Sequence, residues 1–140
     1  MAAIDTSTET GRRVDERLRT ERTIWLATVT DGGSPAVRPV WFVWDGESLL
    51  VFSRPAAAKV REIAANPAVC LHLDPDEWGE NVVILTGTAR IAREHAGADA
   101  TAAYVEKYGW GFERLGVTVE ELARDYSVPI LIEVDGLRAY

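Results

Sequence analysis

The chain has 140 residues, the usual length of one compact domain, and its net charge of −7 disfavours nonspecific nucleic-acid binding, which depends on clustered lysine and arginine. Its apolar stretches are too short to span a bilayer and no secretory signal precedes them, so we expect one soluble, cytoplasmic domain without membrane attachment. The single cysteine, Cys70, excludes an internal disulfide and a cysteine-based zinc site.

The N-terminal region divides into two parts. Residues 1–11 are polar and are predicted to form a flexible tail, which leaves a single domain over 12–140. The domain begins with a short basic helix over 12–22, in which apolar residues lie four apart among charges. The arginines of this helix either remain solvated or reach an anionic cofactor tail, and the candidates for that contact are Arg12, Arg13 and Arg17.

A hairpin follows. Residues 23–30 are rich in β-branched and aromatic residues, and Asp31-Gly32-Gly33 supplies the turn to a second strand over 36–44. That strand is apolar on both faces, as expected between a core and a ligand or partner chain. Pro39 has no N–H for ladder pairing, which predicts an edge or a bulge, with Arg38 pointing out of the ladder there.

The rest of the chain alternates strands with short helices. Asn66-Pro67 ends the first helix, Gly87 predicts a bulge, and Gly109-Trp110-Gly111 is expected to break a later helix. Residues 104–115 either form a mobile lid or anchor a helix turn. The further strands are predicted over 49–53, 68–74, 82–92 and 129–134, and the helices over 56–65, 94–108 and 118–124. This order predicts a mainly β fold, a six-stranded antiparallel barrel with short helices.

The helix over 56–65 carries cations where its N-terminus is already positive. Arg54, Lys59 and Arg61 all precede its first acid, Glu62. A bound phosphate would remove this conflict, because free N–H groups, the helix dipole and the Lys59 ammonium would converge on one anion. Ser53 would add a hydroxyl donor. The alternative is that all three cations extend into solvent.

Several motifs occur together in a fixed order: GSPAVRPVWF over 33–42, the turn Asp45-Gly46, Lys59 in a helix ended by Asn66-Pro67, and TGTA over 86–89. This set resembles the pyridoxamine 5′-phosphate oxidase-like FMN-binding split-barrel family, and most closely its branch that uses the deazaflavin coenzyme F420. The resemblance covers about residues 24–93. It implies a homodimer of split β-barrels with a flavin-like cofactor in each groove at the subunit interface.

The resemblance also implies roles for individual residues. Lys59 would hold the phosphate, and the Trp78 loop would reach across from the other subunit. The anionic tail of F420 would meet cations beyond the phosphate, and the candidates are Arg54, Arg61 and the N-terminal arginines. The strand carrying Arg38 would run beside the ring. The complete set implied to bind the cofactor is Arg38, Pro39, Val40, Trp41, Ser53, Lys59, Arg61 and Trp78.

Such a cofactor carries the reactive atom itself, so we expect no catalytic side chain and no metal site. We expect an F420-dependent oxidoreductase that transfers hydride to a small organic acceptor, with FMN as the alternative cofactor. A non-enzymatic flavin or haem carrier is the competing class, and His72 or His95 would then be the axial ligand. A purely structural dimerisation module is the third possibility. The acids of the PDEWGEN loop lack a calcium-loop pattern and predict a solvated turn.

Overall fold

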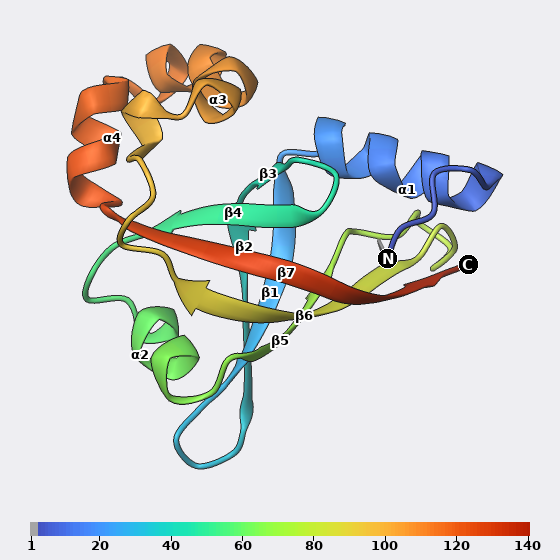
Figure 1. The fold of residues 1–140 in the computed structure, drawn as a ribbon. Coiled ribbons are helices and arrows are strands. Elements are labelled where there is room, and N and C mark those ends of the chain that lie inside the picture. The colour runs from blue at the N-terminus through green and yellow to red at the C-terminus, as the bar shows by residue number, and fades with distance from the viewer. Residues whose placement is uncertain (1–2) are drawn as a thin grey trace.

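One curled antiparallel sheet organises the computed structural model, which describes residues 3–140 (Figure 1). Its seven strands lie in the order β2-β1-β5-β6-β7-β4-β3. The strands are β1 Thr23–Val29, β2 Pro35–Trp41, β3 Val43–Trp44, β4 Ser48–Ser53, β5 Ala68–His72, β6 Val83–Ile91 and β7 Val128–Ala139. The helices are α1 Glu9–Thr20, α2 Ala58–Ala65, the 3₁₀ helix η1 Ala98–Ala100, α3 Ala102–Leu115 and α4 Val119–Asp125. The architecture is a mainly β half-barrel with short helices, consistent with a split barrel.

The sheet has seven strands rather than the predicted six, because the segment over 36–44 is interrupted at Phe42. The Phe42 N–H donates to Tyr108 Oη at 2.9 Å, and its carbonyl accepts from Lys107 Nζ at 2.9 Å. Side chains of α3 therefore take the place of strand partners for this backbone unit. The apolar run in the sequence gives no indication that α3 contacts the backbone at Phe42.

Two local features of the sheet agree with the sequence predictions. Pro39 lies on β2, at one end of the strand order, opposite Trp25 of β1. The β6–β7 register shifts between Thr86 and Gly87, which confirms the predicted irregularity. A Cβ on Gly87 would lie 2.4 Å from the Glu133 carbonyl oxygen, so the close approach of the two strands requires glycine at this position.

The sheet buries apolar residues on both of its faces. Along β4, Leu49 and Val51 belong to the main core, whereas Leu50 and Phe52 belong to a second cluster that includes Tyr104 and other residues of α3. Successive strand residues point to opposite faces, so the two clusters lie on opposite sides of β4. The second cluster is what attaches α3 and α4 to the sheet, and Figure 1 shows these helices together beside one end of β4.

The N-terminal helix begins earlier than expected. Thr8 caps α1, since Thr8 Oγ1 accepts from the Gly11 N–H at 2.9 Å, and the helix starts at Glu9 rather than at residue 12. Ile4 is buried in the main core. Part of the segment predicted as a tail is therefore packed against the domain, while residues 1–2 lie outside the described residues.

The predicted helix break at residues 109–111 is wrong, because α3 continues to Leu115. Gly116 ends it in the left-handed conformation, with φ 71°. The buried Gly111 faces the Trp41 ring, which would lie 3.9 Å from a Cβ at that position. Gly109 and Gly111 thus lie within a helix that packs close to the sheet. This helix starts at Ala102 instead of residue 94.

The C-terminal part of the chain contains one confirmed cap and one longer strand. Thr118 caps α4 as predicted, with the Glu121 N–H donating to Thr118 Oγ1 at 3.1 Å. β7 extends to Ala139, beyond the predicted end at 134, because it pairs along the whole of β6. Among residues 3–140, no helix combines the length and apolar character needed to cross a membrane.

Candidate cofactor site

A cavity of about 440 Å³ lies between β2, the start of α2 and the helices α3 and α4. β2 forms one wall with Pro39, Val40 and Trp41, and Lys59 lies among the lining residues of α2 and the loop before it. Tyr104 belongs to the helical wall. Small-molecule sites are typically about 300–1,000 Å³ in volume, so this cofactor cavity is large enough for a ligand.

The fold brings together the two parts of the sequence that were predicted to form one site. Pro39, Val40 and Trp41, predicted beside a ring, and Lys59, predicted at a phosphate, all line the cofactor cavity. They come from a strand and a helix that are separated by β3 and β4 in the chain. The four other predicted residues line no part of this cavity in the described chain, and they are Arg38, Ser53, Arg61 and Trp78.

Lys59 is a half-buried cation without a counter-charge. Burial lowers the pKa of Lys59 below its ordinary value, and the nearby positive charge of Arg38 lowers it further. None of the ion pairs found among residues 3–140 includes Lys59. A desolvated charge without a partner is unfavourable in the free protein, and an anion in the cavity would relieve it.

Arg38 holds the helix that carries Lys59 instead of lining the cavity. Its guanidinium forms an ion pair with Glu62 Oε1 at 3.0 Å and donates to Thr28 Oγ1 at 2.7 Å. The Thr28 hydroxyl donates to the same carboxylate at 2.8 Å. These contacts, that of Thr28 first and that of Arg38 next, keep the pKa of Glu62 below its ordinary value. Together they fasten α2 to β1 and β2 and so fix the position of Lys59.

Ser53 and Arg61 lie beside the cavity lining without belonging to it. Ser53 is fully buried, and its hydroxyl donates to the Arg54 carbonyl at 3.0 Å. Arg61 is exposed on α2. Arg54 does line the cavity, and its guanidinium carbon lies 4.9 Å from the ring centroid of Tyr126. Of the two candidates Arg54 and Arg61, only Arg54 lines the cavity in the described chain, beside Lys59.

Comparison with known proteins assigns the chain to a family. The family model of pyridoxamine 5′-phosphate oxidase matches residues 11–129, which include β1 to β6 and the whole cofactor cavity. The chain belongs to this family. Members of the pyridoxamine 5′-phosphate oxidase-like family bind flavin-type cofactors. No curated protein matches the sequence.

Solved structures of the same fold belong to proteins with different functions. An F420 reductase is 28% identical to this chain, with a TM-score of 0.64 and coverage of 89% of this chain and 94% of that one. The haem storage protein HutZ from Vibrio cholerae is 21% identical, with a TM-score of 0.64 and coverage of 94% and 95%. A candidate pyridoxamine 5′-phosphate oxidase from Listeria innocua is 21% identical, with a TM-score of 0.67 and coverage of 91% and 95%.

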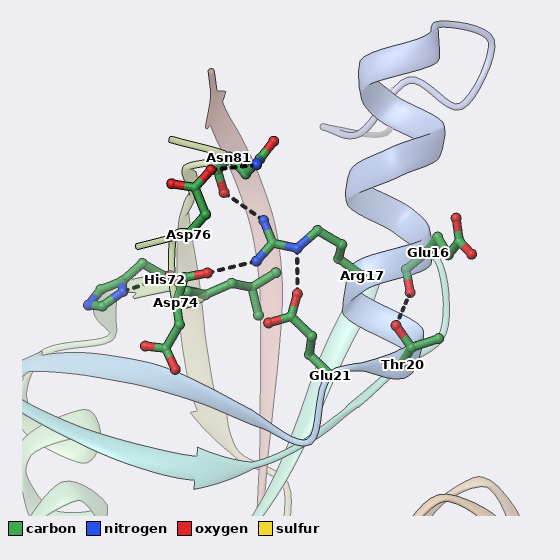
Figure 2. Close-up of polar contacts among 9 residues, drawn as sticks. Glu16, Arg17, Thr20, Glu21, His72, Asp74, Asp76 and Asn81 are labelled. Carbon is green, nitrogen blue, oxygen red and sulfur yellow. Dashed lines mark hydrogen bonds and ion pairs between the residues drawn. The ribbon is translucent and has the colours of Figure 1, made fainter. Parts of the chain in front are cut away.

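In this family member the loop that carries Trp78 is organised by polar contacts (Figure 2). The Asp76 carboxylate accepts from two backbone N–H groups of the loop at 2.9 Å and from the Asn81 amide at 3.0 Å. Arg17 of α1 donates to the carbonyl oxygens of Asp74 at 2.8 Å and Asn81 at 2.6 Å. Arg17 thus fastens α1 to the loop, and Trp78 itself is 81% exposed.

The aromatic wall of the cavity was not anticipated from the sequence. Tyr104 of α3 is buried, and burial raises its pKa above the ordinary value, so the phenol stays neutral. Tyr126 follows α4 and stacks against Arg54. The spacing of Tyr104, Tyr108 and Phe112 marks one apolar face of a helix, and by itself that pattern indicates core packing.

Neither of the two histidines belongs to the lining of the cofactor cavity in the described chain. The His72 ring stacks on Trp25 of β1, with centroids 6.1 Å apart. His95 follows β6, and its ring lies edge-on to the lining residue Phe52, with centroids 6.4 Å apart. Residues 3–140 contain no group of three or more histidine, cysteine, aspartate or glutamate side chains placed to hold a metal ion.

Proposed function

We propose that this protein is an F420-dependent oxidoreductase that passes hydride between the deazaflavin and a small organic acceptor. The observation that carries the proposal is the environment of Lys59, a half-buried cation without a counter-charge at the cavity bounded by Pro39 to Trp41. The bound cofactor would supply the hydride-carrying ring. The chain would bind its phosphate, orient the ring and exclude water from it.

The start of α2 suits a phosphate. The residue before the helix, Ala57, offers no side-chain cap, and the first turn contains no acid. The first N–H groups of a helix have no partners within the helix, and the positive end of the dipole adds to the charge of Lys59. A phosphate at this point would therefore satisfy several donors at once.

The wall formed by β2 suits a planar heterocycle. β2 is the last strand at its end of the sheet order, so its outer backbone edge has no strand partner within the described chain. Backbone N–H and C=O groups there remain free to pair with the polar edge of a ring. The half-buried Trp41, at the end of β2, provides an apolar surface beside that edge.

Two observations favour F420 over FMN. The F420 reductase of known structure is 28% identical over 89% of this chain. Arg54 adds an exposed cation to the cavity that also contains Lys59, where F420 but not FMN continues beyond the phosphate into glutamate carboxylates. FMN remains the second candidate, because its phosphate and ring would meet the same groups.

The proposal includes a homodimer. The open edge of β2, the exposed Val37 on that strand and the exposed Trp78 on an organised loop would all gain a partner in a second copy. Sedimentation velocity on the purified protein tests this part separately, and a monomer at micromolar concentration would contradict it.

Titration of the protein with F420 and with FMN, followed by tryptophan fluorescence, tests the cofactor. We expect F420 to bind more tightly than FMN, and Lys59→Ala to weaken F420 binding by about tenfold or more, as for loss of a charged hydrogen bond. Arg61→Ala is the matched control, since it removes an exposed cation from the same helix. Tighter binding of FMN, or equal effects of the two variants, would overturn the proposal.

A further inference from the structure

Tyr104 of α3 is a buried tyrosine whose hydroxyl faces the cofactor cavity. The residue is only 3% exposed, and it lines that cavity. Every enclosed side-chain nitrogen or oxygen atom among residues 3–140 has a hydrogen-bond partner. No hydrogen bond of the Tyr104 hydroxyl is found among the same residues. This hydroxyl is therefore not enclosed by protein atoms, and the space onto which it opens is the cofactor cavity.

The packing of the Tyr104 ring fixes the direction of its hydroxyl. The ring lies edge-on to Phe52 of β4, with centroids 5.0 Å apart, and its centroid is also 5.0 Å from that of Tyr108. Tyr108, one helical turn further along α3, uses its own hydroxyl to contact the backbone of Phe42 and Arg22. One of these two neighbouring phenols thus supports the fold, whereas the other presents a fixed, free hydroxyl to the cavity.

The cavity around this hydroxyl contains cations and aromatic groups but no acid among residues 3–140. Its two cations, Lys59 and Arg54, are those assigned above to the phosphate and to the anionic tail. Tyr126, the other phenol of the lining, lies against the Arg54 guanidinium. Burial raises the pKa of Tyr104 above its ordinary value, so its hydroxyl keeps the proton at neutral pH. Tyr104 is therefore an uncharged hydrogen-bond donor in a largely apolar part of the cavity.

We propose that the Tyr104 hydroxyl donates a hydrogen bond to the carbonyl oxygen of an uncharged ketone or aldehyde bound in the cavity. This carbonyl compound is the hydride acceptor, an assignment that rests on the proposed function. An uncharged ligand suits the site, because a cationic ligand would meet no acid and both cations are already assigned to the cofactor. Tyr104 belongs to the helical wall, so a ligand bound against a ring on the β2 wall would lie within its reach.

The hydrogen bond would act where charge develops during the reaction. The carbonyl carbon gains a hydride, with its two electrons, from the reduced cofactor, which is thereby oxidised. The π electron pair of the carbonyl moves to the oxygen, and a proton from water completes the alcohol. A preorganised donor aimed at that oxygen stabilises the developing negative charge. The same donor would meet a ligand carbonyl in the absence of the cofactor, so the contact can be tested by binding alone.

Titration of the cofactor-free protein with para-dimethylaminoacetophenone tests this contact. The absorption band of this ketone moves to longer wavelength when its carbonyl oxygen accepts a hydrogen bond. We expect a dissociation constant on the order of 1 mM, as for a ligand of this size. Tyr104→Phe should weaken binding by about three- to tenfold, as for the loss of one neutral hydrogen bond, and should move the band of the bound ketone to shorter wavelength. Tyr140→Phe removes an exposed phenol outside the cavity and should change neither quantity.

The band position separates a hydrogen-bond donor from a residue that only shapes the cavity, because a packing role would not change it. If the ketone binds Tyr104→Phe with the affinity and band position of the wild type, or does not bind the wild type, the proposal is refuted. It is also refuted if Tyr126→Phe alone causes both changes. If the ketone binds with the expected dependence on Tyr104 and F420 does not bind, the proposed function fails and the donor remains. If F420 binds and Tyr104→Phe changes nothing, only the donor fails.

Discussion

Arg38 and Glu62 form an ion pair, with Nη2 3.0 Å from Oε1, that joins β2 to the helix carrying Lys59. The side chain of Glu62 is 7% exposed and that of Arg38 24%. The pair therefore lies largely out of water, and its loss would leave an uncompensated charge beside the cofactor cavity.

We expect Glu62→Gln to lower the free energy of unfolding by about 2 kcal/mol, because Arg38 would lose its counter-charge in a largely buried position. Urea denaturation measures this change. Glu94→Gln is the control, since it removes the acid of the Arg90–Glu94 pair, whose side chains are 56% and 64% exposed. That variant should unfold at nearly the same urea concentration as the wild type. Equal effects would mean that the Arg38 pair does not stabilise α2.

We expect Tyr108→Phe to destabilise the protein by about 1–3 kcal/mol, because the buried N–H of Phe42 would lose its acceptor. Tyr104→Phe is the matched control on the same helix. Tyr104 lines the cofactor cavity, and no hydrogen bond of its hydroxyl is found among residues 3–140, so removal of this hydroxyl should change the denaturation midpoint little. A Tyr108→Phe variant as stable as the control would show that α3 does not support the interruption between β2 and β3.

The half-buried Lys107 predicts a pH-dependent stability. Burial lowers the pKa of Lys107 from 10.5 to about 8. The folded protein thus disfavours the charged ammonium at neutral pH, and this penalty disappears as the pH rises through the folded pKa towards the unfolded one. We expect the melting temperature of the wild type, relative to Lys107→Met, to rise between about pH 8 and pH 10.5. A constant difference across this range would contradict the lowered pKa.

Two glycine substitutions should have opposite effects. Gly87→Ala places a Cβ 2.4 Å from the Glu133 carbonyl oxygen and should destabilise the bulge between β6 and β7. Gly109→Ala meets nothing within 4 Å and lies inside α3, so it should stabilise the protein by about 0.5–1 kcal/mol. Thermal melting of the two variants distinguishes these outcomes. A destabilising Gly109→Ala would be evidence against a continuous α3.

The sequence alone determined the features that depend on neighbouring residues. The alternation of β1, the cap at Thr118, the irregularity at Gly87 and the cations at the start of α2 all follow from periodicity, capping and backbone restriction. Each of these signals depends on residues only a few positions apart in the chain, so it can be recognised from the sequence without the structure. The short motifs spread over 24–93 were also sufficient to indicate the family that the comparison assigns.

Tertiary structure decided the features that depend on distant partners. The interruption at Phe42 requires Tyr108, which lies 66 positions away in the chain, and the role of Arg38 is set by Glu62 on another element. Gly111 belongs to a continuous helix only because that helix packs against Trp41. Such contacts form when the sheet curls and buries its second face under α3. The local sequence records which residues are apolar or charged, but the fold decides which of them meet.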